Sequence, residues 1–368
     1  MSKKTAKKPA KTANEILKLA GVGTGNIFRS CHLPPLLEHP EVELIAACDI
    51  NEERAKSIAA ANNIPHAFKD YRDVLKLDGL DAVDICTPNK FHSEIAVAAL
   101  EAGLHVFCEK PDAISMKEAQ RMADAAKASG KTLMVMRNNR FRGDSRFLKQ
   151  YIAAGKMGDV YTGRCGWQRR RGIPGKGGWF TTKELSGGGP LIDLGVHIMD
   201  LATWLMGDPK PVAVTGCTYR KFAESSASDS VHSQFGEAKE DGVFDVEDLA
   251  IGFIRFDNGA SLQIEFSWAS NVAEENVFIE LRGSKAGCYW NNQKPLRVFA
   301  EDSGALLDVS PKISPLPREG HGANLWHFVD VLKGRDEPTI RPEHGVHMIG
   351  ILTAMYESAQ TGKEVRLD

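Results

Sequence analysis

The 368-residue sequence predicts an α/β chain with two domains: a doubly wound parallel sheet first, then a large, mainly antiparallel open sheet. Up to about residue 138, short apolar runs alternate with amphipathic segments, as they do when helices connect the buried strands of a parallel sheet. Beyond residue 139, strand-like runs follow one another with turn residues between them, which is typical of antiparallel pairing. The length also favours two domains, because single cores stop growing at roughly 250–300 residues.

In the first half, the strands are predicted from continuous apolar runs at residues 17–22, 42–49, 81–87, 104–108 and 132–136. Helices are predicted between them, at residues 27–37, 51–63, 93–103 and 117–130. The last three end near Gly or Asn, residues that favour helix C-termini. Strand–helix alternation of this kind predicts a sheet with helices on both faces.

In the second half, helices are predicted at 144–155, 195–206, 323–333 and 342–361. A strand-like alternation begins near residue 158, and five further strands are predicted within 211–222, 248–256, 260–270, 276–283 and 286–292. The segment 222–242 is polar and aperiodic, which predicts a long surface loop. This pattern favours one large open sheet with helices on one face.

Charge and cysteine content exclude several classes of protein. The net charge of -2 gives no field that would attract nucleic acid or an anionic membrane, and no apolar run approaches the ~20 residues of a membrane span. Seven cysteines without a C-x-x-C pair predict free thiols in a reducing compartment, hence a cytoplasmic protein. Residues 1–14 carry five lysines, and we expect a disordered basic tail; a nucleic-acid arm is the alternative, without aromatic or motif support. The cysteines and histidines lack metal-ligand spacing, and His344 and His347 are expected on a helix surface.

The first apolar run ends in GVGTGNIF, a glycine-rich turn of the kind that holds a dinucleotide between a strand and a helix. Two registers are possible, which place either Asn26 or Phe28 at the third glycine position. We prefer the second, in which Gly23 makes the tight turn and Gly25 lets the backbone approach the pyrophosphate. This context predicts an NAD(P)-binding Rossmann domain over residues 15–138. The predicted contacts of the turn are Gly23, Thr24, Gly25, Asn26 and Ile27.

The second strand ends in Asp49, at the position where a carboxylate accepts hydrogen bonds from the adenosine ribose hydroxyls. Such a carboxylate repels a 2′-phosphate, so NAD is preferred over NADP. Arg54, five residues further on, could soften that preference. An alternative role for Asp49 is the N-cap of the following helix, and neighbouring residues could fill both roles.

Three further segments carry polar residues at strand ends or in the second half: Thr87–Asn89 with His92 nearby, EKP at 109–111 and GGGPLIDLGVH at 187–197. Together with GTGNIF and the CD pair at 48–49, these blocks in this order resemble the glucose–fructose oxidoreductase / inositol dehydrogenase / rhizopine catabolism (Gfo/Idh/MocA) family. The likeness covers nearly the whole chain after the tail. Phe28 departs from the family, which usually has Gly or Ala there.

The resemblance implies a role for each matching position. It makes Lys110 the active-site lysine, and Asp193 and His197 the D-x-x-x-H pair. It also places Glu109 at the nicotinamide ribose and a cis bond before Pro111. By the same match, the cofactor cleft would be lined by Thr87, Pro88 and Asn89, next to Lys110. His92 is a further candidate neighbour of the cofactor, and capping or packing at the start of its helix is the alternative.

The residue types suit the oxidation of a secondary alcohol. An imidazole such as that of His197, with an ordinary pKa near ~6.5, can accept the hydroxyl proton, and the Lys110 ammonium can stabilise the developing alkoxide. If the segment is helical, the i, i+4 spacing puts Asp193 and His197 on one face, so that Asp193 could orient the imidazole or bind a substrate hydroxyl. Gly195 lowers helix propensity there, so a turn or helix start is the alternative.

We therefore predict an NAD(P)-dependent oxidoreductase that acts on a secondary hydroxyl or ketone of a sugar, cyclitol or related polyol. An NAD-dependent glycosidase that oxidises transiently, and a cofactor-sensing regulator without turnover, are the alternatives. Residues 139–368 would bind substrate and form a homodimer or homotetramer, since an open sheet commonly buries its bare face against a partner. The predicted substrate contacts are Asn138, Arg140, Trp167, Arg169, Trp179, Asp193, His197 and His321.

Overall fold

A computed structural model describes residues 15–367 of the chain, and the predicted basic tail lies outside the described residues. The first sheet has six strands in the order β3-β2-β1-β4-β5-β6, and every pairing is parallel. Its strands are β1 (Leu17–Val22), β2 (Val42–Cys48), β3 (His66–Phe68), β4 (Ala82–Ile85), β5 (His105–Cys108) and β6 (Leu133–Val135). The five predicted strands are confirmed; β3 has three residues, too few to show a pattern.

The helices of the first half are α1 (Leu33–Leu37), α2 (Glu52–Ala61), α3 (Tyr71–Val74), α4 (His92–Glu101) and α5 (Met116–Ser129). The helix after the glycine-rich turn differs from the prediction, because Phe28–His32 is a π-helical turn that leads into α1. Pro34 and Pro35 open α1 and cannot donate backbone hydrogen bonds to the preceding turn. The wider turn fits that loss, and it directs His32 into the interior.

The second sheet has nine strands in the order β14-β13-β12-β11-β7-β10-β9-β8-β15, and only the β7–β10 pair is parallel. This confirms a large, mainly antiparallel open sheet. Its strands are β7 (Val160–Gln168), β8 (Pro211–Tyr219), β9 (Leu249–Phe256), β10 (Ser261–Ser267), β11 (Asn276–Gly283), β12 (Ala286–Asn291), β13 (Arg297–Asp302), β14 (Ala305–Val309) and β15 (Val365–Arg366). The last three were not predicted.

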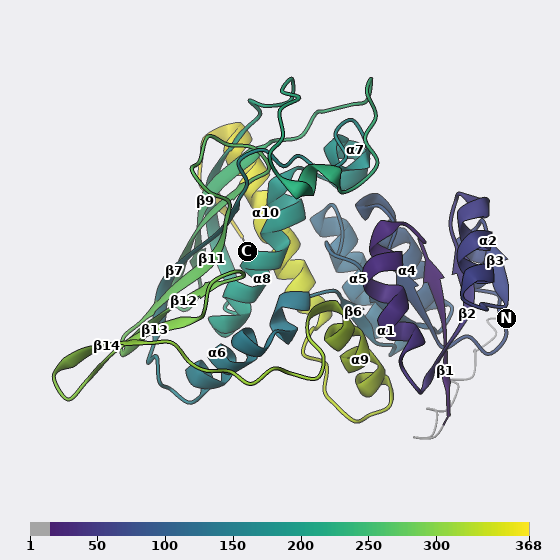
Figure 1. Cartoon of the computed structure of the whole chain (residues 1–368), viewed down its shortest axis with the longest axis horizontal. Coiled ribbons are helices and arrows are strands. Elements are labelled where there is room, and N and C mark those ends of the chain that lie inside the picture. Colours follow the sequence, from purple (N-terminus) through teal and green to yellow (C-terminus); the bar gives the residue numbers. More distant parts are fainter. Residues whose placement is uncertain (1–14, 368) are drawn as a thin grey trace.

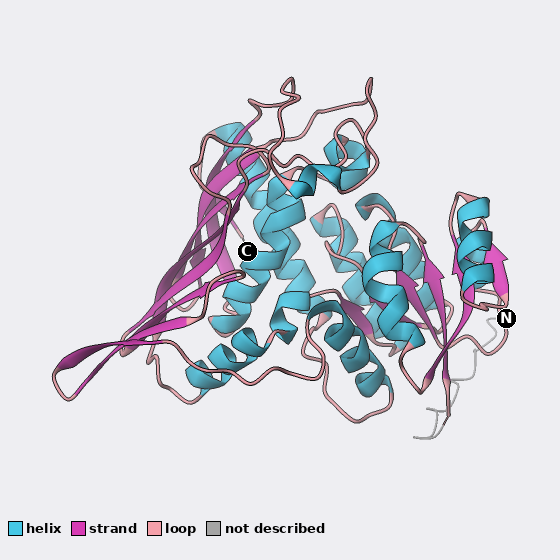
Figure 2. Cartoon of the chain, in the orientation of Figure 1, coloured by secondary structure: helices cyan, strands magenta, loops and turns pink. Residues whose placement is uncertain are grey.

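Helices cover one face of the second sheet, as Figures 1 and 2 show. The helices of this half are α6 (Gly143–Ala153), α7 (Lys183–Ser186), α8 (Val196–Leu205), α9 (Gly320–Leu332) and α10 (Pro342–Thr361). Helix α8 contacts β7 and β11, whereas α10 contacts both β8 and α5. Helix α9 packs on α1, so the C-terminal part of the chain returns to the first half. One apolar cluster runs from Val22 and Ile85 in the first sheet to Ile264 and Trp290 in the second.

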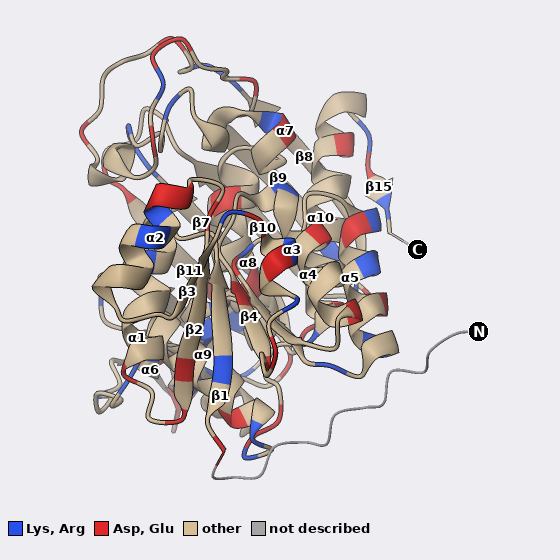
Figure 3. Ribbon diagram, turned by 90° about the vertical axis from the view of Figure 1, so that its right-hand side faces the viewer, with Lys and Arg blue, Asp and Glu red and all other residues tan. Residues whose placement is uncertain are grey.

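Acidic and basic residues are interspersed along the helices on the side shown in Figure 3. The seven cysteines are free thiols, and five of them are buried. Across residues 15–367, no helix combines the length and the apolar character needed to cross a membrane.

Candidate active site

The first sheet reverses its strand order between β1 and β4, which is where open α/β sheets bind ligands at the carboxyl ends of their strands. Polar side chains follow each strand at this edge. Asp49 follows β2, Thr87 follows β4, Glu109 and Lys110 follow β5, and Asn138 follows β6. These predicted cofactor and substrate residues therefore share one edge of one sheet.

The glycine-rich turn is shaped to approach a ligand. Gly23 has φ +90°, and a Cβ there would lie 2.6 Å from the Cys86 carbonyl group, so a side chain does not fit. A Cβ on Gly25 would meet no protein atom within 4 Å, which leaves the backbone open to a pyrophosphate. The Phe28 ring packs against Gly21 of β1, where a Cβ atom would lie only 2.4 Å from the ring. The space between strand and helix is therefore provided by a glycine in the strand, not by a glycine at position 28.

Asp49 faces the turn rather than capping the next helix. Its Oδ2 accepts hydrogen bonds from the backbone N–H of Thr24 at 2.9 Å and from the Thr24 hydroxyl at 3.1 Å. Its Oδ1 accepts the backbone N–H of Asn51 at 2.8 Å. Asn51 itself caps α2 by accepting the Arg54 N–H, so the alternative role of Asp49 as N-cap is wrong.

The polar loop 222–242 reaches back to the first domain, which its composition did not indicate. Arg54 Nη2 donates to Glu237 Oε1 at 3.0 Å, while Arg54 Nη1 lies 3.6 Å from Asp49 Oδ2. The guanidinium therefore lies between two carboxylates, one of which faces the glycine-rich turn.

Three residues that follow β4 have different surroundings. Thr87 Oγ1 is buried without a hydrogen-bond partner, which fits a contact with a bound ligand. Asn89 instead donates to the carbonyl of Ser186 in the second half, at 2.8 Å. His92 is fully buried between the carbonyls of Pro111 and Thr87, at 2.7 and 2.8 Å. His92 therefore holds two loops together, which argues against its predicted contact with the cofactor.

Lys110 and Asp193 meet across the two halves of the chain. Lys110 Nζ donates to Asp193 Oδ1 at 2.9 Å and to its backbone carbonyl at 3.1 Å. The indole of Trp268 donates to Asp193 Oδ2 at 3.0 Å. Burial alone would raise the pKa of Asp193, but the Lys110 charge and then Arg169 outweigh it and lower that pKa. The Lys110–Pro111 bond is cis, as predicted.

The glycine run before Asp193 lets the chain pass close to a buried carboxylate. Glu247 accepts the N–H groups of Gly189 at 3.0 Å and Leu191 at 3.2 Å. A Cβ on Gly189 would lie 2.0 Å from the Glu247 carbonyl oxygen. A π-helical turn over Leu191–Gly195 then continues into α8, which fixes where Asp193 and His197 project.

His197 lies in the same electrostatic environment without bonding to Asp193. Burial lowers its pKa to about 3, with a further contribution from Lys110 and an opposing one from Asp193. The pKa of His197 therefore lies well below the ordinary imidazole value near 6.5. The carboxylate of Asp193 is bonded to Lys110 and Trp268 instead, so these contacts do not support the alternative in which it orients the imidazole.

An aromatic side chain of β7 and a cationic side chain just after it lie near His197. The Trp167 ring lies 6.2 Å from the His197 ring, and the Arg169 guanidinium lies 5.0 Å from the Trp167 ring centre. Arg169 is buried and its Nε has no hydrogen-bond partner, nor has Glu275 Oε1. Burial lowers the pKa of Arg169 to about 10, against the charges of Asp193 and Glu275. Unpaired buried polar atoms of this kind fit a polar ligand.

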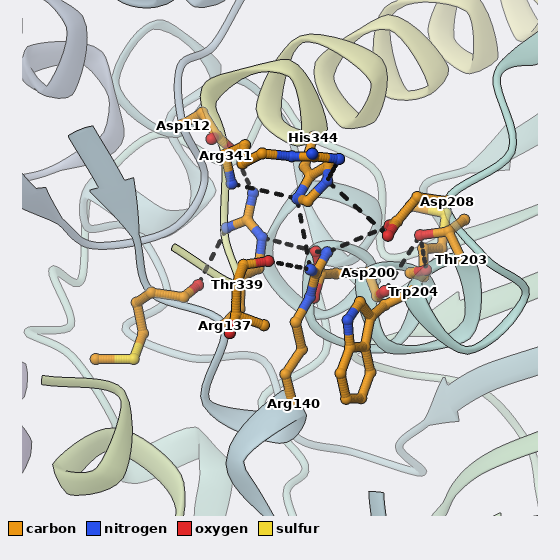
Figure 4. Close-up of polar contacts among 12 residues, drawn as sticks. Asp112, Arg137, Arg140, Asp200, Thr203, Trp204, Asp208, Thr339, Arg341 and His344 are labelled. Atoms are coloured by element: carbon orange, nitrogen blue, oxygen red, sulfur yellow. Dashed lines mark hydrogen bonds and ion pairs between the residues drawn. The ribbon is translucent and has the colours of Figure 1, made fainter. Parts of the chain in front are cut away.

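The structure gives Arg140 another role, as Figure 4 shows. Its Nε and Nη2 donate to the two carboxylate oxygens of Asp200 at 2.8 and 2.7 Å, and Nη1 donates to the Thr339 carbonyl at 3.1 Å. Arg140 is 2% exposed, so its donors are used inside the protein and its predicted contact with substrate is not supported. His344 lies 3.4 Å from Arg140 with its side chain 8% exposed, which corrects its expected place on the helix surface.

The three remaining predicted substrate contacts, Trp179, Asn138 and His321, have different surroundings. Trp179 stacks on Phe180 with ring centres 3.9 Å apart, and no hydrogen bond or ring contact among residues 15–367 joins it to Lys110 or His197. Asn138 and His321 both line a cleft of about 440 Å³ between α1 and the start of α9. The Oδ1 atom of Asn138 is buried without a partner.

His32 and Asp84 belong to the site and were not predicted. His32 Nδ1 lies 2.9 Å from Asp84 Oδ2, and its Nε2 lies 2.8 Å from Glu109 Oε1. Burial would lower the pKa of His32, but Asp84 raises it well above its ordinary value. Burial would likewise raise the pKa of Glu109, which the His32 hydrogen bond and charge hold well below normal. Cys86 Sγ, 3.4 Å from Nδ1, completes a group that could also ligate a metal.

Comparison with known proteins agrees with this two-domain fold. Residues 17–137 match the model of an oxidoreductase family with an NAD-binding Rossmann fold, and residues 145–289 match the model of the GFO/IDH/MocA C-terminal domain. The chain is 32% identical over 352 residues to D-glucoside 3-dehydrogenase of Escherichia coli (strain K12), covering 95% of this chain and 97% of that one.

Two further similarities extend the comparison. A putative UDP-kanosamine synthase oxidoreductase subunit of Amycolatopsis mediterranei (strain S699) is 35% identical over 269 residues, 73% of each chain. The crystal structure of GenD2 from gentamicin A biosynthesis, in complex with NAD, superposes with a TM-score of 0.78 at 26% identity, over 98% of this chain and 99% of that one. Some other relatives are named for NADP(+).

Proposed function

Because the chain belongs to the Gfo/Idh/MocA family of oxidoreductases, we propose that it oxidises a secondary hydroxyl, or reduces the corresponding ketone, of a sugar, cyclitol or related polyol with NAD. The single observation that carries this proposal is the meeting of Lys110 and Asp193 at 2.9 Å, beside His197 and at the strand edge that would hold the cofactor. A lysine and an imidazole from different halves of the chain thus converge where a substrate could lie.

Residues of the crevice fit a dinucleotide. Gly25 leaves room for a pyrophosphate, Asp49 suits the adenosine ribose, and the unpartnered hydroxyl of Thr87 offers a hydrogen bond. On the other side of the turn, Glu109 and Asn138 would face the nicotinamide half. NAD, when bound, accepts the hydride that leaves the carbon bearing the hydroxyl.

The protein's own groups would handle the proton and the charge. His197 is neutral at physiological pH because its pKa is about 3, so a ring nitrogen is free to accept the hydroxyl proton. The Lys110 ammonium, held by Asp193, would stabilise the negative charge that develops on the substrate oxygen. Trp167 and Arg169 supply an aromatic face and hydrogen-bond donors for the remaining hydroxyls.

A reduction screen over glucosides, other sugars, sugar acids and inositols tests the proposal, with NAD and NADP in parallel and the absorbance of the reduced cofactor as readout. We expect NAD to be reduced with at least one of these compounds. On that substrate, H197A and K110M should each lower turnover roughly 10²–10⁴-fold. Near wild-type turnover of both variants would contradict the assignment.

The same screen separates two other functions. An NAD-dependent glycosidase would release sugar from a glycoside without net reduction of the cofactor. A cofactor-sensing regulator would bind NADH yet turn over no compound of the panel. Neither has a specific structural observation in its favour.

The preference for NAD is also part of the proposal. Arg54 could attract a 2′-phosphate, but Asp49 and Glu237 flank its guanidinium and offset its charge. E237Q should therefore raise the affinity for NADP relative to NAD several-fold, measured by titration of both reduced cofactors. The matched control E224Q lies in the same loop and should leave the ratio unchanged; an unchanged ratio in E237Q would remove Glu237 from the argument.

We further propose that the chain forms a homodimer or homotetramer through the bare face of the second sheet. Val277, Ile279 and Leu281 of β11 point toward α8 and are buried, so Phe278 and Glu280 project from the opposite face. That face carries aromatic residues beside arginines, a composition typical of interfaces: Phe253 with Arg255, Phe278 with Arg164 and Phe299 with Arg297.

A further inference from the structure

His32 is a fully buried ionisable group next to the candidate site that the proposed chemistry leaves unused. It is 0% exposed, and both of its ring nitrogens face carboxylates, Asp84 on one side and Glu109 on the other. Between two ionised carboxylates, which only accept hydrogen bonds, the imidazole must carry both N–H groups and is therefore the cation. The three side chains come from three separate segments: the π-helical turn, β4 and the end of β5.

We propose that His32 is a positioning residue that holds Glu109 in place for the nicotinamide half of the cofactor. This inference rests on the proposed NAD-dependent function. His32 itself would touch neither cofactor nor substrate.

The contacts of Glu109 show how little freedom its carboxylate has. Oε1 accepts from His32 at 2.8 Å, and Oε2 accepts the backbone N–H of Lys110 at 3.1 Å. Both oxygens are thus oriented, and each keeps a lone pair for a further donor such as a ribose hydroxyl. The same hydrogen bond to the Lys110 backbone ties the carboxylate to the segment whose side chain reaches Asp193.

The topology places this contact at one end of the cofactor crevice. In the order β2-β1-β4-β5, the glycine-rich turn follows β1, Asp49 follows β2 and Glu109 follows β5. If Asp49 binds the adenosine ribose, Glu109 lies on the opposite side of the pyrophosphate and meets the other ribose. A substitution of His32 should therefore weaken only the binding of the nicotinamide half of the cofactor.

Charge explains why an imidazole is needed at this position. Asp84 is fully buried and Glu109 is 5% exposed, and two buried carboxylates facing each other would repel strongly without the cation between them. Loss of one such partner leaves an uncompensated buried charge, so the remaining carboxylate should protonate or move. Either change would remove the orientation that a ribose contact requires.

The experiment compares two ligands by calorimetric titration: NADH, which has both halves, and ADP, which lacks the nicotinamide half. H32Q should bind NADH roughly tenfold or more weakly, because it loses a charge-assisted hydrogen bond, while its ADP affinity stays within about twofold of wild type. D84N should show the same selective loss and serves as the second variant if H32Q does not fold. In a double-mutant cycle, adding H32Q to E109Q should weaken NADH binding little further, because His32 acts through Glu109.

His105 provides a matched control, because it is a partly buried histidine at the opposite end of the same strand, β5. H105Q should bind NADH and ADP as wild type does. Equal weakening of both ligands in H32Q, unchanged NADH binding, or additive effects with E109Q would each overturn the proposal. So would stoichiometric zinc in the purified protein with His32, Asp84 and Cys86 as its ligands. A wild-type protein that binds NADH but oxidises no sugar would refute the proposed function while the binding comparison still decides the role of His32.

Discussion

Lys110 and His197 are coupled through charge rather than through a direct bond. Among residues 15–367, the hydrogen bonds of the Lys110 ammonium go to Asp193, and none joins it to His197. The Lys110 charge nevertheless ranks second only to burial among the causes that lower the pKa of His197. The proton-accepting capacity of the imidazole therefore depends on a lysine from the other domain.

K110M should raise the pKa of His197 from about 3 toward its ordinary value of 6.5, because a nearby positive charge disfavours the protonated ring. NMR titration of the histidine ring signals, assigned with H197A, measures this directly. Lys127, exposed on α5, supplies the control K127M, which should leave the titration unchanged. A His197 pKa that stays near 3 in K110M would mean that burial alone sets it.

Some site residues could be predicted from the sequence and others could not. Lys110, Asp193 and His197 could be predicted because they stand in ordered motifs at strand and helix ends. Arg140 was assigned to substrate from its position after β6, yet Asp200, 60 residues away, takes up its guanidinium. His32 was not predicted at all, because its carboxylate partners lie 52 and 77 residues away in the sequence. Partner choice for a buried charge depends on tertiary contacts that local patterns do not contain.

At the scale of elements, the turn after β1 gives two neighbouring glycines different tasks. Gly23 has a left-handed backbone and no room for a Cβ, whereas Gly25 faces open space. Backbone conformation requires the first glycine, and ligand approach requires the second.

G23A should lower the free energy of unfolding by about 1–3 kcal/mol or more, because alanine must adopt a strained backbone against the Cys86 carbonyl. G25A should keep wild-type stability but bind NADH at least about tenfold more weakly, since its methyl group occupies the space left for the pyrophosphate. Urea unfolding and NADH titration of both variants check this division. Wild-type NADH affinity in G25A would show that the pyrophosphate does not approach this glycine.

Two helical turns of the site have the π form, Phe28–His32 and Leu191–Gly195, and they carry His32 and Asp193. The 3.6-residue period predicts a helix over 27–37 and another that begins only at residue 195, and it does not show the wider turns that redirect these side chains. The strands show a similar limit. Strands with alternating burial, such as β10 and β11, were predicted, whereas β14 is exposed along its whole length and has no alternation to detect.

At the scale of the whole molecule, buried histidines should make stability depend on pH. Burial lowers the pKa of His105 to about 4 and those of His197 and His344 to about 3. Below roughly pH 6.5 the unfolded chain binds protons that these folded-state groups do not, so stability falls as the pH falls. His32 has the opposite sign, because its raised pKa gives a contribution that is complete below pH 6.5 and is lost only as the pH rises.

The free energy of unfolding should therefore decrease from pH 7 to pH 4.5, by about 1.4 kcal/mol per pH unit for each of the three histidines. The midpoint of urea unfolding should decrease with it. H105Q should make the decrease shallower by about one such contribution. His66, which is exposed on β3, gives the control variant H66Q, whose slope should match wild type. A flat profile over this range would contradict the low pKa values.

The bare face of the second sheet sets the expected assembly of the molecule. Pairing of β9 with β10, of β10 with β7 and of β7 with β11 brings Ile251 into one row with Phe278 across the sheet. Ile251 is 37% exposed, and Phe278 stacks with Tyr289 on the same face. Large apolar side chains gathered on a sheet face that no helix covers are a mark of protein–protein contact.

Light scattering should accordingly give a mass of two or four times the 40.3 kDa of one chain. The double variant I251D/F278D should shift this mass toward that of a single chain, because burying two carboxylates in an apolar interface is unfavourable. I50D is the matched control. Ile50 is 85% exposed but lies in the first domain and not on the second sheet, so this variant should keep the wild-type mass. A single-chain mass for the wild-type protein at micromolar concentration would show that this face is not a subunit contact, and a wild-type mass for I251D/F278D would place the contact on another surface.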